Sequence, residues 1–276
     1  MTRSNRPLQV VADELSEAAR SLDLARVRTL LVEFTAYEDE IDPKTGRLRA
    51  ALVRDWQLLI AAHRRRRRLA ETLIEGGADP NGCESTGIPL VAEAAFRFDW
   101  ATIEMLIELG ADVNGFGPDR RILALDTALT RQPALVRQLL EIGADPNLPT
   151  QHYFFRPSSG ATASVARTPV ATAFAQGIGP FVQLVNAGGR IEGAFPHMPL
   201  IRVAAEYCWA DRLDYLRLLG YDDPAIHERP QLAAAAGATT ELKAVTGTGT
   251  GTVDQRDQFG RTPLVMAVLC GRSETV

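Results

Sequence analysis

Residues 69–81, LAETLIEGGADPN, contain a phrase that the chain uses twice more. The second copy runs from Ile103 to Asn114 and the third from Val136 to Asn147. One glycine of each copy recurs at an interval of 33 residues, at Gly77, Gly110 and Gly143. A constant interval of this length is typical of proteins built from stacked structural repeats.

The residues of one copy predict a helix followed by a turn. Ile103, Leu106 and Ile107 have the i, i+3, i+4 spacing of a helix with one buried face. Gly110 comes where the chain leaves this helix, and glycine adopts a left-handed helix cap without strain. The Ala-Asp-Val-Asn that follows favours a turn, because Asp and Asn side chains hydrogen-bond to nearby backbone groups.

These copies resemble the ankyrin-repeat family, in which the second helix of a repeat ends in Leu-Leu-x-x-Gly-Ala-Asp-Val-Asn. The family's Gly-x-Thr-Pro-Leu phrase is echoed at residues 86–90, 167–173 and 257–264. The resemblance covers about residues 8–276 and implies an all-α ankyrin-repeat solenoid of seven to eight helix-turn-helix pairs, several of them degenerate. It also implies a right-handed stack with hairpin-like loops that project from one edge.

The predicted domain organisation is a single ankyrin-repeat array over residues 1–276. Its parts are a degenerate N-terminal cap repeat with a long loop (1–49), regular repeats (50–147), an inserted loop (148–167), divergent repeats (168–245), and a Gly/Thr-rich turn with an incomplete C-terminal repeat (246–276). The last repeat stops before its second helix, so we expect either a fragment of a longer array or an array with an unusual end.

Composition predicts a soluble, cytoplasmic protein. Hydrophobic residues make up 46% of the chain and charged residues 23%, as in folded soluble proteins. The three cysteines, Cys83, Cys208 and Cys270, are far apart and odd in number, which favours reduced thiols. No signal peptide or membrane helix is predicted, although delivery by a route without a signal peptide stays open. The Ala- and Arg-rich composition is compatible with a bacterium.

Five consecutive arginines, Arg64–Arg68, have two interpretations. They could form a basic patch for nucleic acid, for an acidic partner or for nuclear targeting. They could instead form a solvated turn, with Arg65 and Arg66 at the tip between two helices. We favour the turn, because a net charge of −4 and the lack of a second basic patch with aromatic residues do not fit nucleic-acid binding.

The sequence predicts no enzyme activity. The four histidines, His63, His152, His197 and His227, fall in different repeats, and no Cys or His has metal-ligand spacing. Asp79, Asp112 and Asp145 recur once in each period, which marks them as turn-forming residues. We therefore predict no catalytic, cofactor-binding or metal-binding residues and no cofactor.

Two segments carry the candidate partner-binding residues. One is the hairpin-like loop with Phe116, Asp119, Arg120 and Arg121, which is exposed by its position in an ankyrin repeat. The other is the insertion with Tyr153, Phe154, Phe155 and Arg156. Adjacent aromatic residues in a loop either bind a partner or fold back on the array, and the sequence does not choose between the two.

The resemblance implies a protein-interaction module or scaffold that binds a protein partner through its concave face and projecting loops. One alternative is a bacterial immunity or inhibitor protein that neutralises a toxin. Another is the ankyrin platform of a longer effector whose catalytic part lies outside this chain. We expect a monomer with no membrane contact, and the sequence does not identify the partner.

Overall fold

The computed structural model describes residues 6–37, 40–43, 46–116, 122–156, 161–194, 198–239 and 254–272. Within the ranges 151–156 and 161–166 it describes the backbone alone. The chain divides into two compact units, Met1–Pro169 and Val170–Val276. The single array over the whole chain stays a prediction.

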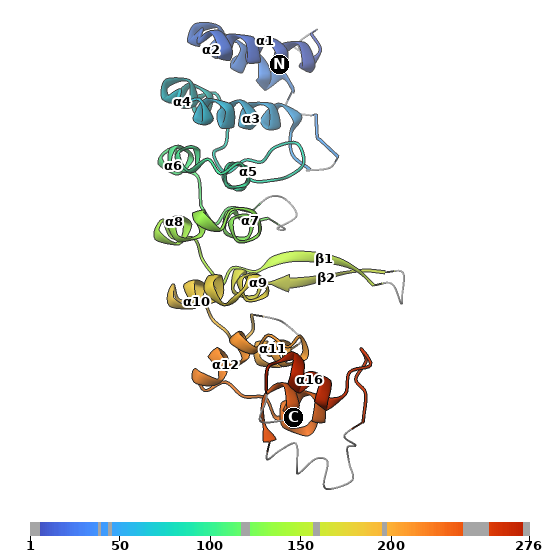
Figure 1. Cartoon of the computed structure of the whole chain (residues 1–276). Helices are drawn as coiled ribbons and strands as arrows, with labels where there is room; N and C mark the ends of the chain where they lie inside the picture. Colours follow the sequence, from blue (N-terminus) through green and yellow to red (C-terminus); the bar gives the residue numbers. More distant parts are fainter. Residues whose placement is uncertain are drawn as a thin grey trace. The chain divides into compact units, whose positions relative to one another are not determined.

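The first unit consists of stacked helix pairs and a hairpin. Figure 1 shows the first helices of the pairs in one row and the second helices in another. This arrangement confirms the expected all-α architecture of helix pairs. The first unit's helices are α1 (Leu8–Ser21), α2 (Leu24–Phe34), α3 (Arg49–His63), α4 (Arg67–Glu75), α5 (Leu90–Phe96), α6 (Trp100–Glu108), α7 (Ala124–Arg131) and α8 (Val136–Glu141), with 3-10 turns at Thr35–Tyr37 and Pro133–Leu135.

Small and aliphatic residues form the core between the helices. Ala61 and Ala62 on α3 are fully buried, which lets neighbouring helices approach closely. The predicted ridge of α6 is confirmed at Ile103 and Leu106, which are both 0% exposed. Phe34, which occupies the place of the closing glycine in the first repeat, is also fully buried. The core is therefore distributed along the stack, as in other repeat proteins.

The second unit contains further helix pairs and one short helix that the sequence did not indicate. That helix, α13, begins at Pro224, and the Asp223 carboxylate accepts a hydrogen bond from the Ala225 N–H at its start. The Gly/Thr-rich segment 246–252 lies outside the described residues. The second unit's helices are α9 (Pro169–Gln176), α10 (Ile178–Asn186), α11 (Leu200–Glu206), α12 (Ala210–Leu218), α13 (Pro224–Glu228), α14 (Pro230–Ala235) and α16 (Pro263–Leu269).

The insertion at residues 148–167 is more ordered than the expected loop. Strands β1 (Thr150–Arg156) and β2 (Ala161–Arg167) form an antiparallel hairpin, with Thr150 opposite Arg167 and Arg156 opposite Ala161. The aromatic residues of β1 favour extended structure, whereas the sequence alone suggested only partner binding or packing on the array for them. Figure 1 shows the hairpin extending on the side of the unit where α7 lies.

Asparagine side chains connect successive turns of the first unit. The Asn114 side chain donates to the Gly143 carbonyl (3.0 Å) and accepts from the Asp145 N–H (2.8 Å). Both partners belong to the next repeat, so the predicted local turn also forms a link between repeats. The equivalent bonds one repeat earlier join Asn81 to Gly110 (3.3 Å) and to Asp112 (2.6 Å).

In four helix pairs the turn between the two helices uses a left-handed residue that is not glycine. A side chain in this conformation costs roughly 1–2 kcal/mol relative to glycine, because its Cβ crowds the following carbonyl. Phe98 carries this strain while its side chain is 54% exposed, so packing compensates for only part of it. The non-glycine residues with positive φ are Leu22, Arg65, Phe98 and Cys208, at φ values of 57–62°.

Replacing Asn114 should weaken the link between two repeats. We expect Asn114→Ala to lower the free energy of unfolding by about 1–2 kcal/mol, because one donor and one acceptor are lost at a partly exposed site. Asn114→Asp keeps the acceptor for the Asp145 N–H but places a negatively charged acceptor against the Gly143 carbonyl, so it should be at least as destabilising as Asn114→Ala. Urea unfolding followed by circular dichroism measures the stability of the two variants. Unfolding midpoints equal to that of the wild type would show that the Asn114 link does not contribute to stability.

Two glycine exchanges test the strain in the turns. Phe98→Gly should raise the free energy of unfolding by roughly 0.5–1 kcal/mol, since relief of the left-handed strain exceeds the entropy cost of glycine. Gly110→Ala should lower it by about 1 kcal/mol or more. A Cβ at Gly110, where φ is +97°, would meet no atom within 4 Å, so this loss reports the backbone alone. Thermal unfolding measures the stability of both variants. A Phe98→Gly protein less stable than the wild type would show that packing of the ring outweighs the backbone strain.

Candidate functional site

The residues predicted to bind a partner fall partly outside what the structure describes. Phe116 is described and half-buried. Asp119, Arg120 and Arg121 lie outside the described residues. The backbone of Tyr153–Arg156 forms most of β1, but the placement of these side chains is outside the description as well. The role of these residues in binding stays a prediction.

A buried contact anchors the base of the hairpin. The Thr150 hydroxyl is fully buried and donates to the Asp126 carboxylate on α7 (2.7 Å). The same hydroxyl lies 3.1 Å from the carbonyl of Arg167, so both strands meet at this point. Burial lowers the pKa of Arg167, and the nearby Asp126 opposes that shift. The base of the hairpin is therefore fixed to α7.

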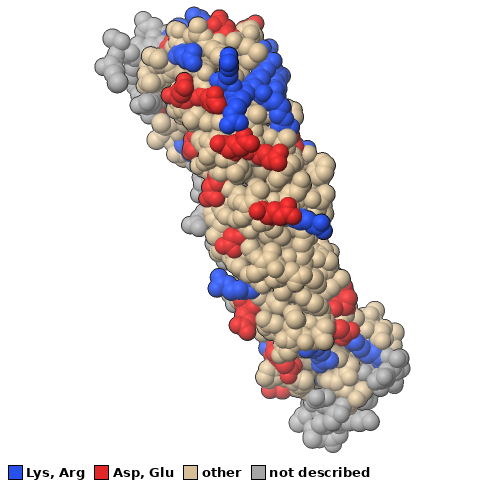
Figure 2. Space-filling view, turned by 90° about the vertical axis from the view of Figure 1, so that its left-hand side faces the viewer, with Lys and Arg blue, Asp and Glu red and all other residues tan. Residues whose placement is uncertain are grey.

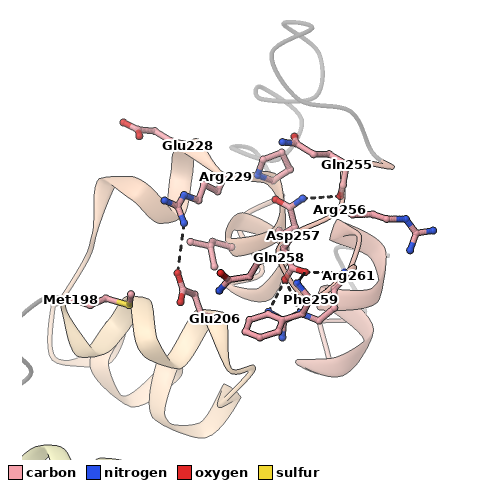
Figure 3. Close-up of a pocket in the computed structure, with 13 residues that line it drawn as sticks. Met198, Glu206, Glu228, Arg229, Gln255, Arg256, Asp257, Gln258, Phe259 and Arg261 are labelled. Carbon is pink, nitrogen blue, oxygen red and sulfur yellow. Dashed lines mark hydrogen bonds and ion pairs between the residues drawn. The ribbon is translucent and has the colours of Figure 1, made fainter. Parts of the chain in front are cut away.

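An open groove of about 500 Å³ lies within the second unit. Its walls come from α11, from the start of α14 and from the turn that precedes α16 (Figure 3). Glu206 on α11 and Arg229 point toward each other, with 3.6 Å between their charged groups. Phe259 contributes an aromatic ring that is 58% exposed, and the Arg261 guanidinium lies 4.7 Å from the ring centroid. The groove thus presents charged, amide and aromatic groups together.

The Asp257 carboxylate holds the turn that carries Phe259. It accepts hydrogen bonds from the N–H groups of Phe259 (2.8 Å) and Arg261 (2.9 Å) and pairs with the Arg261 side chain (2.7 Å). Partial burial by itself would raise the pKa of Asp257, but these hydrogen bonds outweigh it and lower the pKa. The sequence predicted only the start of a repeat at residues 257–264. The phenylalanine at position 259 of this phrase is the residue that could have indicated a binding site.

The arginine run joins neighbouring repeats. Arg65 occupies the left-handed tip of the turn, as predicted, and donates to Asp99 (3.1 Å) at the start of α6. Asp99 also accepts from Thr102 and contacts His63. Burial favours a higher pKa for Asp99, but its hydrogen bonds to Thr102, His63 and Arg65 lower the pKa to about 2. Arg67 pairs with Glu71 and Glu108, so part of the run has a structural role.

A buried ionic cluster lies at the start of the regular repeats. Asp55 on α3 is 0% exposed, accepts from the Asp79 N–H (2.8 Å) and pairs with Arg47 (3.0 Å). Arg47 comes from the long loop that precedes α3 and also reaches Asp79 (3.3 Å). Burial raises the pKa of Asp55 from its ordinary value of 3.8 to about 6, against the opposing effects of the Asp79 N–H and Arg47. Burial also raises the pKa of the Cys83 thiol beside Arg47.

The described residues contain no group of three or more His, Cys, Asp and Glu side chains that could hold a metal ion. His63 contacts Asp99, and His227 contacts Asp222 at 2.8 Å, each within its own unit. His152 and His197 lie outside the described side chains. In the part of the chain that the structure describes, no helix has the length and apolar character to cross a membrane.

Comparison with known proteins gives likenesses among solved structures alone. No family model matches the chain, and no curated protein matches it. Among solved structures the chain is similar to the human ASB11 ankyrin repeat domain, with 22% sequence identity and a TM-score of 0.45. The match covers 78% of this chain and 97% of that one.

Ionisation of Asp55 should make stability depend on pH. The native state keeps the Asp55 proton to a higher pH than the unfolded chain does, so stability falls as pH rises from about 4 to about 6. We expect the free energy of unfolding of the wild type, relative to Asp55→Asn, to fall by about 2–3 kcal/mol over this window. Urea unfolding at several pH values measures the difference; a difference that is constant or rises with pH would contradict the raised pKa.

Proposed function

We propose that this protein binds another protein and has no catalytic step of its own. The observation that carries the proposal is the groove of the second unit, where Phe259 and Arg261 are presented beside Arg229. Aromatic and arginine side chains are enriched in protein interfaces and supply most of their binding energy. An exposed aromatic ring held by a hydrogen-bonded turn is already ordered before binding, which lowers the entropy cost of association.

The loops of the first unit supply a second set of proposed contacts. The hairpin is anchored at its base by the hydrogen bond from Thr150 to Asp126, and Figure 1 shows β1 and β2 extending away from the helices of the first unit. We include Tyr153–Arg156 and the loop with Phe116, Asp119, Arg120 and Arg121 among the residues that contact the partner. Support comes from residue type and from the position of these segments between helix pairs.

The test for the groove compares two exposed phenylalanines. Phe259→Ala removes the ring in the groove, whereas Phe96→Ala removes a ring in the first unit that is 49% exposed and has Arg131 at 5.5 Å from its centroid. Each variant and the wild type serve as bait in a native lysate, and cross-linking with mass spectrometry maps the contact. We expect a stoichiometric partner whose affinity falls about tenfold or more with Phe259→Ala and stays unchanged with Phe96→Ala.

Two kinds of result would contradict the proposal. Cross-links that avoid residues 254–261, or an equal loss of affinity in the two variants, would exclude the groove as the site. A folded wild-type bait that retains no protein at all would argue against the proposed function itself.

The hairpin requires its own variant. Replacing Tyr153, Phe154 and Phe155 together by Ala should weaken partner binding by several kcal/mol if these rings are hot spots. Isothermal titration calorimetry with the purified partner measures the affinity, and thermal unfolding measures stability. Unchanged affinity together with a lower melting temperature would show that the rings pack on the helices.

A further inference from the structure

A second cavity, of about 220 Å³, lies in the first unit between α1 and α3. Ser16 and Arg20 on α1 line one side, and Trp56 and Gln57 on α3 line the other. Gln57 donates to the Ser16 hydroxyl (2.8 Å), which fixes the distance between the two helices. The cavity is therefore a built feature of the contact between the first two helix pairs.

Three arginines border this cavity, and among the residues that the structure describes no acidic side chain lines it. Arg64 and Arg66 come from the arginine run, and Arg20 comes from the end of α1. Arg66 donates to the carbonyls of Ala19 (2.9 Å) and Arg20 (3.0 Å), so it caps α1 and is held in place. Among the residues that the structure describes, no carboxylate lies within ion-pair distance of these three guanidinium groups.

Four of the five arginines of the run thus fall into two groups. Arg65 and Arg67 are paired with carboxylates of the next repeat, as in a structural link. Arg64 and Arg66 face the cavity together with Arg20, beside the indole of Trp56. Arg97 of the next repeat lies 5.9 Å from the centre of the Trp56 ring system. A site with clustered guanidinium groups and an aromatic surface suits a carboxylate on an otherwise apolar chain.

We propose that this cavity binds an acidic segment of a partner protein, with Asp or Glu carboxylates against Arg20 and Arg64 and apolar atoms against Trp56. The inference rests on the proposed function, because it assigns a class of partner to a protein-binding module. It gives Arg20 and Arg64, which lie at the cavity without a carboxylate within ion-pair distance among the described residues, a ligand of opposite charge.

The surroundings favour an acidic peptide over a nucleic acid. Figure 2 shows Lys and Arg side chains gathered over the first helix pairs, with Asp and Glu side chains directly beside them. Glu71 and Glu108 belong to this neighbourhood through their pairs with Arg67. An extended phosphodiester backbone needs a continuous basic track, whereas one or two carboxylates need only a cavity of this size.

The experiment measures binding of a fluorescein-labelled peptide of alternating Glu and Leu to the full chain by fluorescence anisotropy at low salt. A peptide of alternating Gln and Leu with the same label is the neutral control. The double variant Arg20→Ala, Arg64→Ala tests the cavity. Arg68→Ala is the matched control, since Arg68 belongs to the same run, is exposed and does not line the cavity.

We expect saturable binding of the acidic peptide, weaker binding at higher salt, and no binding of the neutral peptide. The double variant should lose about tenfold or more in affinity, and Arg68→Ala should stay within about twofold of the wild type. Thermal unfolding should be unchanged in the double variant, because the one side-chain hydrogen bond of these two arginines is that of Arg20 to the Ser16 carbonyl in its own helix.

Three results would overturn the inference. The first is no saturable binding of the acidic peptide, and the second is an equal loss in the double variant and in Arg68→Ala. The third is tighter binding of a single-stranded oligonucleotide that depends on Arg20 and Arg64, which would assign the cavity to nucleic acid. Phe259→Ala should bind the peptide like the wild type, so failure here is separable from failure of the proposed function.

Discussion

Hydrogen bonds from the side chain of one turn to the backbone of the next set the spacing of the helix pairs in the first unit. Asn81 and Asn114 each reach across to the following repeat, with one donor and one acceptor. One repeat before Asn81, the Asp55 carboxylate makes the corresponding hydrogen bond by accepting from the Asp79 N–H. It takes the place of an asparagine because the preceding repeat lacks the Asp-x-Asn turn. A carboxylate in that buried place needs a cation, and the long loop that precedes α3 supplies Arg47.

The periodic part of the sequence was sufficient to predict the helix pairs. The glycine interval and the ridge of Ile103 and Leu106 indicated the second helices, and Phe34 marked the end of the degenerate first repeat. These features are local and recur, so the physics of one repeat applies to the others. The tip of the turn at Arg65 followed from counting along the same period.

The parts that the sequence did not reveal depend on contacts between distant residues. Arg47 lies in a segment outside the period, and nothing in its neighbours along the chain indicates that it pairs with Asp55. The same holds for Thr150 and Asp126, whose contact turns an apparent loop into an anchored hairpin. Arg20 and Arg64 are far apart in sequence, and only the packing of α1 on α3 brings them to one cavity. The groove of the second unit was missed for the same reason, since Arg229 and Phe259 come from different segments.

The anchored base of the hairpin has a consequence for how this protein can change. Because Thr150 and Arg167 face each other across the base, the chain enters and leaves the insertion at adjacent points. Residues added or removed in equal number on both strands would leave the two ends of the insertion paired as they are. The outer part of the hairpin can therefore vary in length and composition at little cost to the fold. Such a segment is suited to rapid divergence when a partner changes.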